Sequence, residues 1–541
     1  MNVHAAAERV RHWLEGDWSS NQRIGFRLIL ASCFTTIVVA FLGPSTVTLN
    51  VGPARSLLPP WFIPADVGAR YGLPLSQWIL VPVLWVSIIV GAVGLWVSWR
   101  AVAAGWRPSI RRLVYLGVGI NLLTACVPPL TSADVLMYAA YGRLQVLGID
   151  PYSIPPAEIF RQTYDPVLIW TERPWQDTPS VYGPIASFSQ YLANVLGGDS
   201  MHDVVFWLQM MCVIPFIVIC GIMIKLAHGN PARQTRSVLL TILNPLLIWA
   251  VIAGAHNEAI SLVFAIAGLW FVRRSSFVTG LCIGLAGCVK VSLVFYGIAL
   301  AWGYRRDWKK LLSLGLGAAV PIGIGYGILS PPGALLAASR NTGYVSGGSW
   351  APIFKGALEF VLPDNLASSI TGLTGWVLML VVGWMLSRVV PWDAVPGAHV
   401  PARQDPLTIA TRTALVISAA WVISSPYSLP WYDLIAWVPL ALLTRNKLDM
   451  LLLWRGAALS VAYVAGRTVG FTEAMTGVTF VVRDVICSFI QIGIIVAVVR
   501  WWWASGRELP TLRGLLTTLR EMLPGAGRRP SRRRSAVAGR R

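Results

Sequence analysis

Residues 131–152, TSADVLMYAAYGRLQVLGIDPY, combine a carboxylate with several aromatic side chains at regular spacing. If the stretch is helical from Asp134 onward, Tyr138 at i+4 and Tyr141 at i+7 lie on one face with the carboxylate at its start. The helix dipole favours the ionised form of an acid at this position, so Asp134 is a candidate general base for a hydroxyl substrate. The same spacing also suits an interfacial aromatic helix that Asp134 merely caps.

A second polar cluster, His256-Asn257-Glu258, follows an apolar run that ends at Ala255. Polar groups at a membrane boundary are candidates for a functional site. His256 suits donation to a phosphate or hydroxyl oxygen, and Glu258 suits hydroxyl binding, orientation of His256 or metal binding. One carboxylate and one histidine are too few to predict a metal site, so we predict no cofactor, although a divalent metal is not excluded. A polar turn between two helices is the alternative interpretation.

Two cations and one aromatic turn are the remaining candidates for the functional site. Lys290 lies between two apolar runs, and Arg340 lies in the Gly/Ser-rich stretch SRNTGYVSGGSW. Both suit phosphate binding, Arg340 through its bidentate fork, but a lysine that extends to the interface and a solvated loop charge are the alternatives. Trp431, Tyr432 and Asp433 suit a wall on which a sugar stacks, and also suit an interfacial aromatic belt.

The composition is that of a polytopic membrane protein. Of 541 residues, 55% are hydrophobic and 13% are charged, against about 25% charged in soluble proteins. The net charge of +20 suggests nucleic acid at first, but the Arg and Lys residues gather in short loops between apolar runs, as the positive-inside rule predicts. The seven cysteines lie in apolar runs without a C-x-x-C pair, which favours structural thiols.

The apolar runs predict an all-α membrane domain over residues 24–503. We expect a cytoplasmic amphipathic arm over 1–23 and a basic cytoplasmic tail over 504–541, the last part disordered. A long outer loop over about 129–202 includes a non-crossing helix at 181–197. About 14 spans are predicted, several of them shorter than the roughly 20 residues of a straight span: residues 24–42, 77–98, 113–128, 203–227, 237–254, 259–272, 277–290, 292–304, 311–330, 371–388, 408–424, 431–444, 450–466 and 477–500.

The positions of the cations orient these spans. Both termini and the loops rich in Arg and Lys are expected inside, and the candidate residues named above then all fall on the outer face. The orientation was fixed by the cations alone. The gathering of the rare polar motifs on one face therefore favours one functional site.

The ordered motifs resemble the actinobacterial polyprenyl-phosphate-mannose-dependent α-1,6-mannosyltransferases, a branch of the GT-C superfamily. The first catalytic loop of that family carries Asp-x-x-x-Tyr…Gly…Gly-x-(Asn/Asp)-Pro-Tyr, which 134–152 matches. The later matches stand in the same order within residues 110–500: Asn244-Pro245, His256-Asn257-Glu258, Val289-Lys290 and Leu429-Pro430-Trp431-Tyr432.

The resemblance implies a GT-C-type fold and an enzyme that transfers mannose from a polyprenyl phosphate to a lipid-linked, growing α-1,6-mannan of the lipomannan or lipoarabinomannan type. The reaction would be an inverting single displacement on the outer face of the plasma membrane, with Asp134 as base. The donor, the mannan acceptor and membrane lipids would be its partners, without nucleic acid. The expected donor phosphate contacts are Lys290, Arg340 and His256, and the expected sugar or acceptor contacts are Tyr138, Tyr141, Asn257, Glu258, Trp431 and Tyr432.

Two other functions remain open. The first is a polyprenyl-phosphate-dependent transferase of arabinose or another sugar, because no residue reads the sugar directly. The second is a flippase or transporter of polyprenyl glycolipids, although we find no paired repeats or midplane polar sites. The sequence has no phosphate-binding G-x-x-x-x-G-K-[ST] loop and no Asp-x-Asp pair, which disfavours ATP-driven transport and nucleotide-sugar donors.

Overall fold

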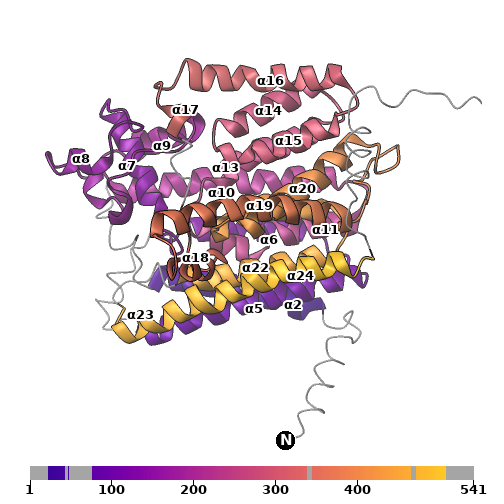
Figure 1. The fold of residues 1–541 in the computed structure, drawn as a ribbon, viewed down its shortest axis with the longest axis horizontal. Helices are drawn as coiled ribbons and strands as arrows, with labels where there is room; N and C mark the ends of the chain where they lie inside the picture. Colours follow the sequence, from indigo (N-terminus) through magenta and orange to yellow (C-terminus); the bar gives the residue numbers. More distant parts are fainter. Residues whose placement is uncertain are drawn as a thin grey trace, which may run out of the picture.

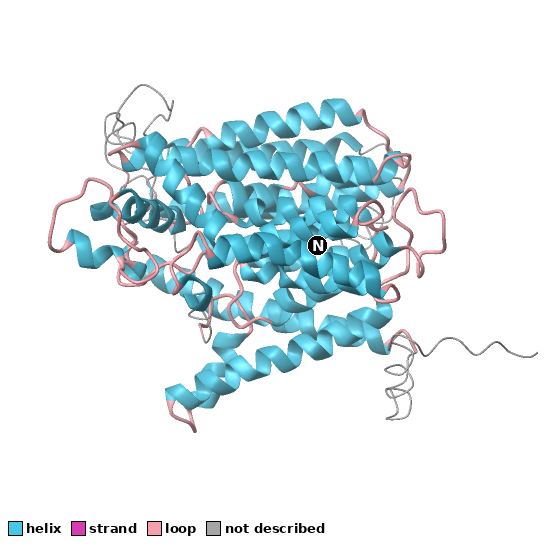
Figure 2. Cartoon of the chain, turned by 90° about the horizontal axis from the view of Figure 1, so that it is seen from above, coloured by secondary structure: helices cyan, strands magenta, loops and turns pink. Residues whose placement is uncertain are grey.

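The computed structural model describes residues 22–42, 47, 51, 76–337, 344–464 and 471–506. Within these ranges all regular secondary structure is helical and there is no strand, as Figure 2 shows. The predicted all-α fold is therefore confirmed. Most of the expected N-terminal arm, nearly all of the basic tail, and Arg340 lie outside the described residues.

Eight helical segments are long and apolar enough to cross a membrane. They are α2 (Gln22–Leu42), α5 (Gln77–Ala103), α10 (Met201–Leu226), the broken helix from α11 (Pro231–Leu240) through α12 (Pro245–Leu247) to the π-helical turn η3 (Ile248–Ile252), α16 (Trp308–Gly327), α19 (Asp364–Val389), α20 (Pro406–Ser424), and α23 (Glu473–Phe480) continued through η7 (Val481–Ile486) into α24 (Cys487–Trp503). The protein is therefore a polytopic membrane protein by the length and composition of its helices.

Six shorter or less apolar helices occupy the remaining predicted runs. They are α6 (Ile110–Ala125), α13 (Glu258–Phe271), α14 (Ser276–Gly287), α15 (Val294–Gly303), α21 (Leu434–Leu442) and α22 (Lys447–Val464). Every predicted apolar run thus falls on a helix. The total of about 14 crossings stays a prediction, because these six are shorter or less apolar than a straight span requires.

Small residues allow some of these helices to pack at close range. A Cβ on Gly280 of α14 would lie 2.2 Å from the backbone oxygen of Leu314, and a Cβ on Gly317 of α16 would lie 2.2 Å from that of Phe277. The backbones of α14 and α16 therefore approach each other as glycine-mediated helix pairs do in membranes.

The predicted outer loop is itself helical and gathers at one end of the bundle. It contains α7 (Asp134–Val146), α8 (Pro156–Phe160) and α9 (Pro184–Gly197), which lie together on the left of Figure 1. The 14 residues of α9 would span only about 21 Å, less than the hydrocarbon core. This helix packs against α7 and α10. That the helix predicted over 181–197 does not cross the membrane stays a prediction. We call this end the Asp134 end.

The loops predicted to lie inside meet one another in a second group, which we call the Arg236 end. Their cations form ion pairs across the chain, each joining residues far apart in sequence: Arg233–Asp393, Arg236–Asp449 and Arg273–Asp405. The chain thus separates its cation-rich loops from its candidate site residues, as the sequence predicts. Which end faces the cytoplasm stays a prediction.

Single cysteines, introduced in a variant without the seven native ones, test this orientation. A cysteine at Gln162, exposed after α8, should react with an impermeant thiol reagent added to intact cells. A cysteine at Ala104, exposed after α5, should react only after the membrane is opened. Labelling of the Ala104 position in intact cells would contradict the predicted orientation.

Candidate functional site

Backbone hydrogen bonds fix the entry to α7 against the turn before α13. The N–H groups of Leu130 and Thr131 donate to the carbonyl oxygen of Ala253, at 2.7 and 3.2 Å, and the Thr131 hydroxyl donates to the carbonyl of Trp249 at 2.9 Å. A Cβ on Gly254 would lie 2.8 Å from the Thr131 hydroxyl oxygen, so only glycine leaves room for this approach. These contacts bring Asp134 next to the turn that carries His256.

The chain before His256 is irregular. Asn244 caps the short helix α12, accepting from the N–H of Leu246 at 3.1 Å, and the following turn η3 is π-helical. Ala255 then has φ of 53°, the one positive φ of a non-glycine residue in the described ranges. This conformation costs an L-residue about 1–2 kcal/mol. Single-turn π-helices and strained residues concentrate at functional sites, so the irregularity marks this turn as a candidate.

His256 lies behind the carboxylate of Asp134. Its side chain is fully buried, and its Nδ1 lies 3.8 Å from Asp134 Oδ2 and 3.4 Å from the hydroxyl oxygen of Tyr138. Its ring stacks on Trp431 with centroids 3.6 Å apart and an interplanar angle of 17°. The imidazole is therefore fixed between α7 and the Trp431 turn, where it can orient Asp134.

Two tyrosines, the buried Tyr138 and the partly buried Tyr182, flank the same carboxylate. The rings of Tyr138 and Tyr182 meet edge to face at 5.2 Å. Burial, and to a lesser degree the nearby Asp134 and Glu258, raise the pKa of both hydroxyls well above the ordinary value. Both hydroxyls therefore stay protonated at neutral pH, which makes them hydrogen-bond donors and leaves Asp134 as the proton acceptor among the three.

Lys290 supplies the cation of the site. Its ammonium pairs with the Glu258 carboxylate and lies 5.0 Å from the centre of the Tyr432 ring. The position is fixed through the backbone, because the N–H of Gly183 donates to the carbonyl of Val289 at 3.1 Å. A Cβ on Gly183 would lie 2.4 Å from the backbone oxygen of Cys288, so the close approach of these two segments needs glycine there.

The aromatic turn η6 (Pro430–Asp433) forms another wall. Asp433 points away from the site into an ion pair with Arg455 of α22, 2.6 Å long, in which each side chain is 1% exposed. Arg455 also donates to the carbonyl of Val422 and to the hydroxyl of Ser428. The structure thus gives Asp433 an anchoring role rather than a place in the predicted sugar-stacking wall, because its carboxylate is needed to neutralise a buried arginine.

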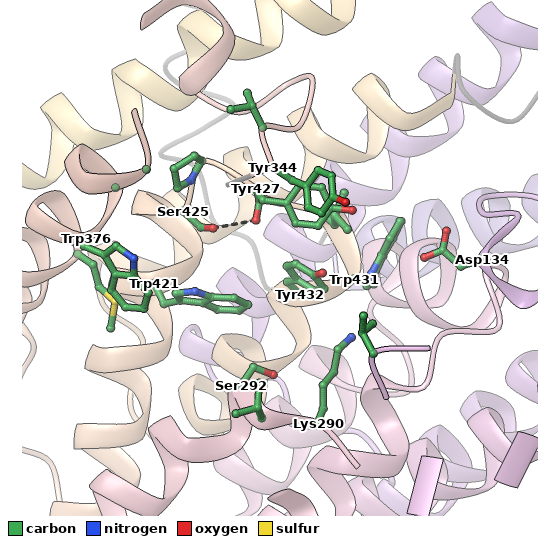
Figure 3. Close-up of a pocket in the computed structure, with 18 of the residues that line it drawn as sticks. Asp134, Lys290, Ser292, Tyr344, Trp376, Trp421, Ser425, Tyr427, Trp431 and Tyr432 are labelled. Atoms are coloured by element: carbon green, nitrogen blue, oxygen red, sulfur yellow. Dashed lines mark hydrogen bonds between the residues drawn. The ribbon is translucent and has the colours of Figure 1, made fainter. Parts of the chain in front are cut away.

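One pocket joins these groups, as Figure 3 shows. Its polar end holds Asp134, Tyr138, Tyr182 and Lys290, and its other end is aromatic and apolar. The remaining lining residues are Val181, Val291, Ser292, Tyr344, Val345, Gly372, Gly375, Trp376, Met379, Trp421, Ser425, Pro426, Tyr427, Leu429, Trp431 and Tyr432. A polar group of this kind beside an extended apolar wall suits a ligand with a polar head and an apolar tail.

The predicted site residues divide into two groups. Asp134, Tyr138, Lys290, Trp431 and Tyr432 all line the pocket. The others do not line it: Tyr141, whose hydroxyl donates to the carbonyl of Thr178 at 2.8 Å, His256, Asn257 and Glu258.

The three residues of the 256–258 turn are nearly fully buried and form the layer behind the pocket. Within the described residues, neither polar atom of the Asn257 amide has a hydrogen-bond partner. The ligand contacts expected for Tyr141, His256, Asn257 and Glu258 stay predictions.

Several residues that line the pocket are not among the site residues predicted from the sequence. Tyr182 has a signal in the Tyr182-Gly183-Pro184 turn, because glycine followed by proline ends a loop and starts a helix. Trp376 and Trp421 lie inside long apolar helices, where an aromatic residue has no distinguishing pattern. Only the packing of α19 beside α20 brings these two together.

The described part of the chain has no group of three or more His, Cys, Asp or Glu side chains that could hold a metal ion. The acidic and basic members of the site are paired with each other or with aromatic rings instead.

Part of the chain matches a known protein family. The model of the family described as "Alpha-(1->6)-mannopyranosyltransferase, N-terminal domain" matches residues 60–305. The resemblance to this family is confirmed. The matched part includes Asp134, the 256–258 turn and Lys290, whereas Trp431 and Tyr432 lie beyond it.

Individual relatives agree with the family match. Alpha-(1->6)-mannopyranosyltransferase B of Corynebacterium glutamicum is 26% identical over 372 residues, covering 61% of this chain and 58% of that protein. A probable alpha-(1->6)-mannopyranosyltransferase of Mycolicibacterium smegmatis is 24% identical over 389 residues, covering 63% of this chain and 65% of that protein. The chain thus spans less than two thirds of the length of these two relatives.

The buried ion pair behind η6 gives a test of how the aromatic wall is held. Arg455→Ala leaves the buried Asp433 carboxyl without its partner, so we expect a loss of about 3–5 kcal/mol in stability. The matched variant Arg161→Ala breaks the ion pair of Arg161 with Asp177, whose side chains are 54% and 58% exposed, and should leave the stability nearly unchanged because solvent screens this pair. Thermal unfolding of both purified variants measures the difference. Equal unfolding midpoints would show that Asp433 does not anchor the turn.

Proposed function

We propose that this chain transfers mannose from a polyprenyl-phosphate-mannose donor to a growing α-1,6-mannan of the lipomannan or lipoarabinomannan type, at the outer face of the plasma membrane. The observation that carries the proposal is one pocket that joins Asp134, Lys290 and an apolar wall. The sugar and the linkage come from the names of the relatives, alpha-(1->6)-mannopyranosyltransferases.

Asp134 is the proposed general base. Its side chain is 24% exposed, lines the pocket and starts α7, where the helix dipole favours a negative charge. His256 is a positioning residue in this account, because its Nδ1 lies near both Asp134 and Tyr138 without lining the pocket. The carboxylate is therefore held in place while one side of it stays open to an acceptor hydroxyl.

Lys290 is the proposed phosphate contact. A lysine ammonium has three N–H donors, and Glu258 accepts one of them. The ammonium also lines the pocket beside Tyr432, so its remaining donors are available to a phosphate oxygen. A cation at this place stabilises the charge that develops on the leaving phosphate, and this stabilisation is a main source of rate in such reactions.

The apolar end of the pocket suits the polyprenyl chain. Val291, just before α15, and Trp376, within α19, both line this end and are 58% and 60% exposed. Both helices also carry exposed apolar side chains, such as Val294 and Leu380, which support an opening of this end toward the bilayer. A prenyl chain could therefore stay in the hydrocarbon while its phosphate reaches Lys290.

The proposed reaction is a single displacement. Asp134 accepts the proton of the acceptor hydroxyl while that oxygen bonds to the anomeric carbon of mannose. The bond between this carbon and the phosphate oxygen breaks, and its electron pair leaves with the polyprenyl phosphate beside Lys290. Attack from the opposite face inverts the configuration, so a β-linked donor gives an α-linked product.

Asp134→Asn tests the base. The amide keeps the size of the side chain but cannot accept the proton, so transfer should fall by at least about 10²-fold, while folding and donor binding persist. The measurement is single-turnover mannosyl transfer with saturating donor and acceptor. The control is Asp177→Asn, the same change at an exposed acid of the same region that does not line the pocket, which should leave the rate unchanged. A rate for Asp134→Asn near that of the unaltered chain would remove Asp134 from this role.

Gly372→Trp tests the path of the lipid chain. A Cβ on Gly372 meets no atom within 4 Å, so the indole can fill the apolar end of the pocket without a clash at its root. If about two methylene groups of the donor lose their burial, at about 0.8 kcal/mol each, the KM for a long-chain donor should rise about 10-fold. A short-chain donor should be affected less.

The matched control is Gly323→Trp, at a glycine of α16 that is exposed, also has no atom within 4 Å of a Cβ, and lies outside the pocket. Kinetics with two donors of different chain length compare the variants. An equal effect of the two substitutions, or no dependence on chain length, would contradict the proposed path.

A further inference from the structure

A second cavity lies at the Arg236 end, between the last turns of α5 and one side of α11. Arginines dominate its polar lining: Arg107, Arg233, Arg236 and Arg445. The apolar part comes from one face of each helix, with Trp99, Val102 and Ala103 on α5 and Leu239 and Leu240 on α11. Figure 1 shows α11 away from the group of α7, α8 and α9, so this cavity is separate from the pocket of Asp134.

The cavity carries more positive charge than its neighbours neutralise. Arg233 pairs with Asp393 and Arg236 pairs with Asp449. Within the described residues, Arg107 donates only to backbone oxygens, those of Val102 at 2.6 Å and Trp106 at 2.8 Å. Among the described residues no hydrogen bond or ion pair holds the Arg445 side chain. Four arginines against two carboxylates leave an excess of two positive charges.

This excess of positive charge affects the pKa of the arginines themselves. The pKa of Arg445 lies below its ordinary value because of partial burial and the nearby Arg100 and Arg236, although Asp449 opposes this shift. The guanidinium groups therefore repel one another at this cavity. An anion between them would relieve the repulsion.

Two buried donors at the cavity also lack acceptors within the described chain. Trp99 is 2% exposed and its indole N–H has no hydrogen-bond partner there. Arg233 is 7% exposed and its Nε–H likewise has none. Leaving a buried donor unsatisfied costs about 1–3 kcal/mol, so both donors fit a ligand that brings acceptor oxygens.

We propose that this cavity binds the phosphate group of an anionic ligand, with Arg445, Arg107 and the Trp99 indole N–H as its donors. The chemistry is that of a phosphate mono- or diester: several acceptor oxygens and a negative charge that arginine contacts in bidentate fashion. A phospholipid headgroup is the source that the location favours, because the cavity lies at the ends of two candidate membrane helices and has apolar walls. A free phosphate ion is the other source of the same chemistry.

The site is independent of the proposed transfer reaction. The helix α10 joins the two ends of the bundle, from the packing against α9 at Met201 to the loop before α11 at Leu226. Its 26 residues correspond to about 39 Å, which separates the two regions by about the thickness of a bilayer. A ligand in the arginine cavity therefore cannot be the donor bound at Lys290.

Native mass spectrometry of the purified full chain, titrated with phosphatidylglycerol and in parallel with phosphatidylcholine, tests the proposal. The unaltered chain should bind the anionic lipid more tightly than the zwitterionic one. Arg445→Gln removes a partly exposed arginine that has no hydrogen bond or ion pair within the described residues, so the fold should persist while the apparent Kd for phosphatidylglycerol rises about 10-fold. Trp99→Phe keeps most of the apolar packing, removes only the indole N–H donor, and should weaken binding in the same direction.

The control is Arg112→Gln, an exposed arginine of α6 at the same end that does not line the cavity. A second arm measures thermal stabilisation by inorganic phosphate in lipid-free detergent. Stabilisation that Arg445→Gln removes and Arg112→Gln retains, without a difference in lipid binding, would assign the site to free phosphate. Equal behaviour of the Arg445 and Arg112 variants in both arms would overturn the proposal.

Discussion

The ion pair between Lys290 and Glu258 is the interaction on which the site depends. The two side chains are 20% and 3% exposed, and either charge alone would be unfavourable at such a place. Their pairing ties the start of α13 to the segment before α15, and the ring of Tyr432 adds a third element at 5.0 Å. A cation is thereby kept at the polar end of a pocket whose other end is aromatic and apolar.

The turn that carries Glu258 also positions the Asp134 carboxylate. His256 contacts Asp134 and Tyr138, while Glu258, two residues later, holds Lys290. The proposed base and the proposed phosphate contact are therefore positioned by one short turn with a strained Ala255 before it. This arrangement explains how residues from distant parts of the chain keep a fixed separation without a metal-binding cluster in the described residues.

The sequence predicts the helices well because apolar runs and cation positions report directly on burial in a membrane. The sequence also predicts that Asp134 and Lys290 belong to the site, because a charged residue beside an apolar run is a candidate for function. The sequence cannot predict how far along a helix a side chain lies from the pocket. Tyr141 shares a face with Asp134, but about 10 Å of helix rise carries it past the pocket. Nor does it show that Asp433 is turned toward Arg455, because that pair joins η6 to another helix.

The central claim is that one pocket holds a phosphate at Lys290 and a prenyl chain along α19, with Asp134 open to an acceptor. The direct measurement is an electron cryo-microscopy map of the full chain in lipid with a polyprenyl phosphate that carries no transferable sugar. We expect phosphate density within hydrogen-bond distance of the Lys290 ammonium and chain density between Val291 and Trp376. Phosphate density elsewhere, with this pocket filled only by solvent, would contradict it.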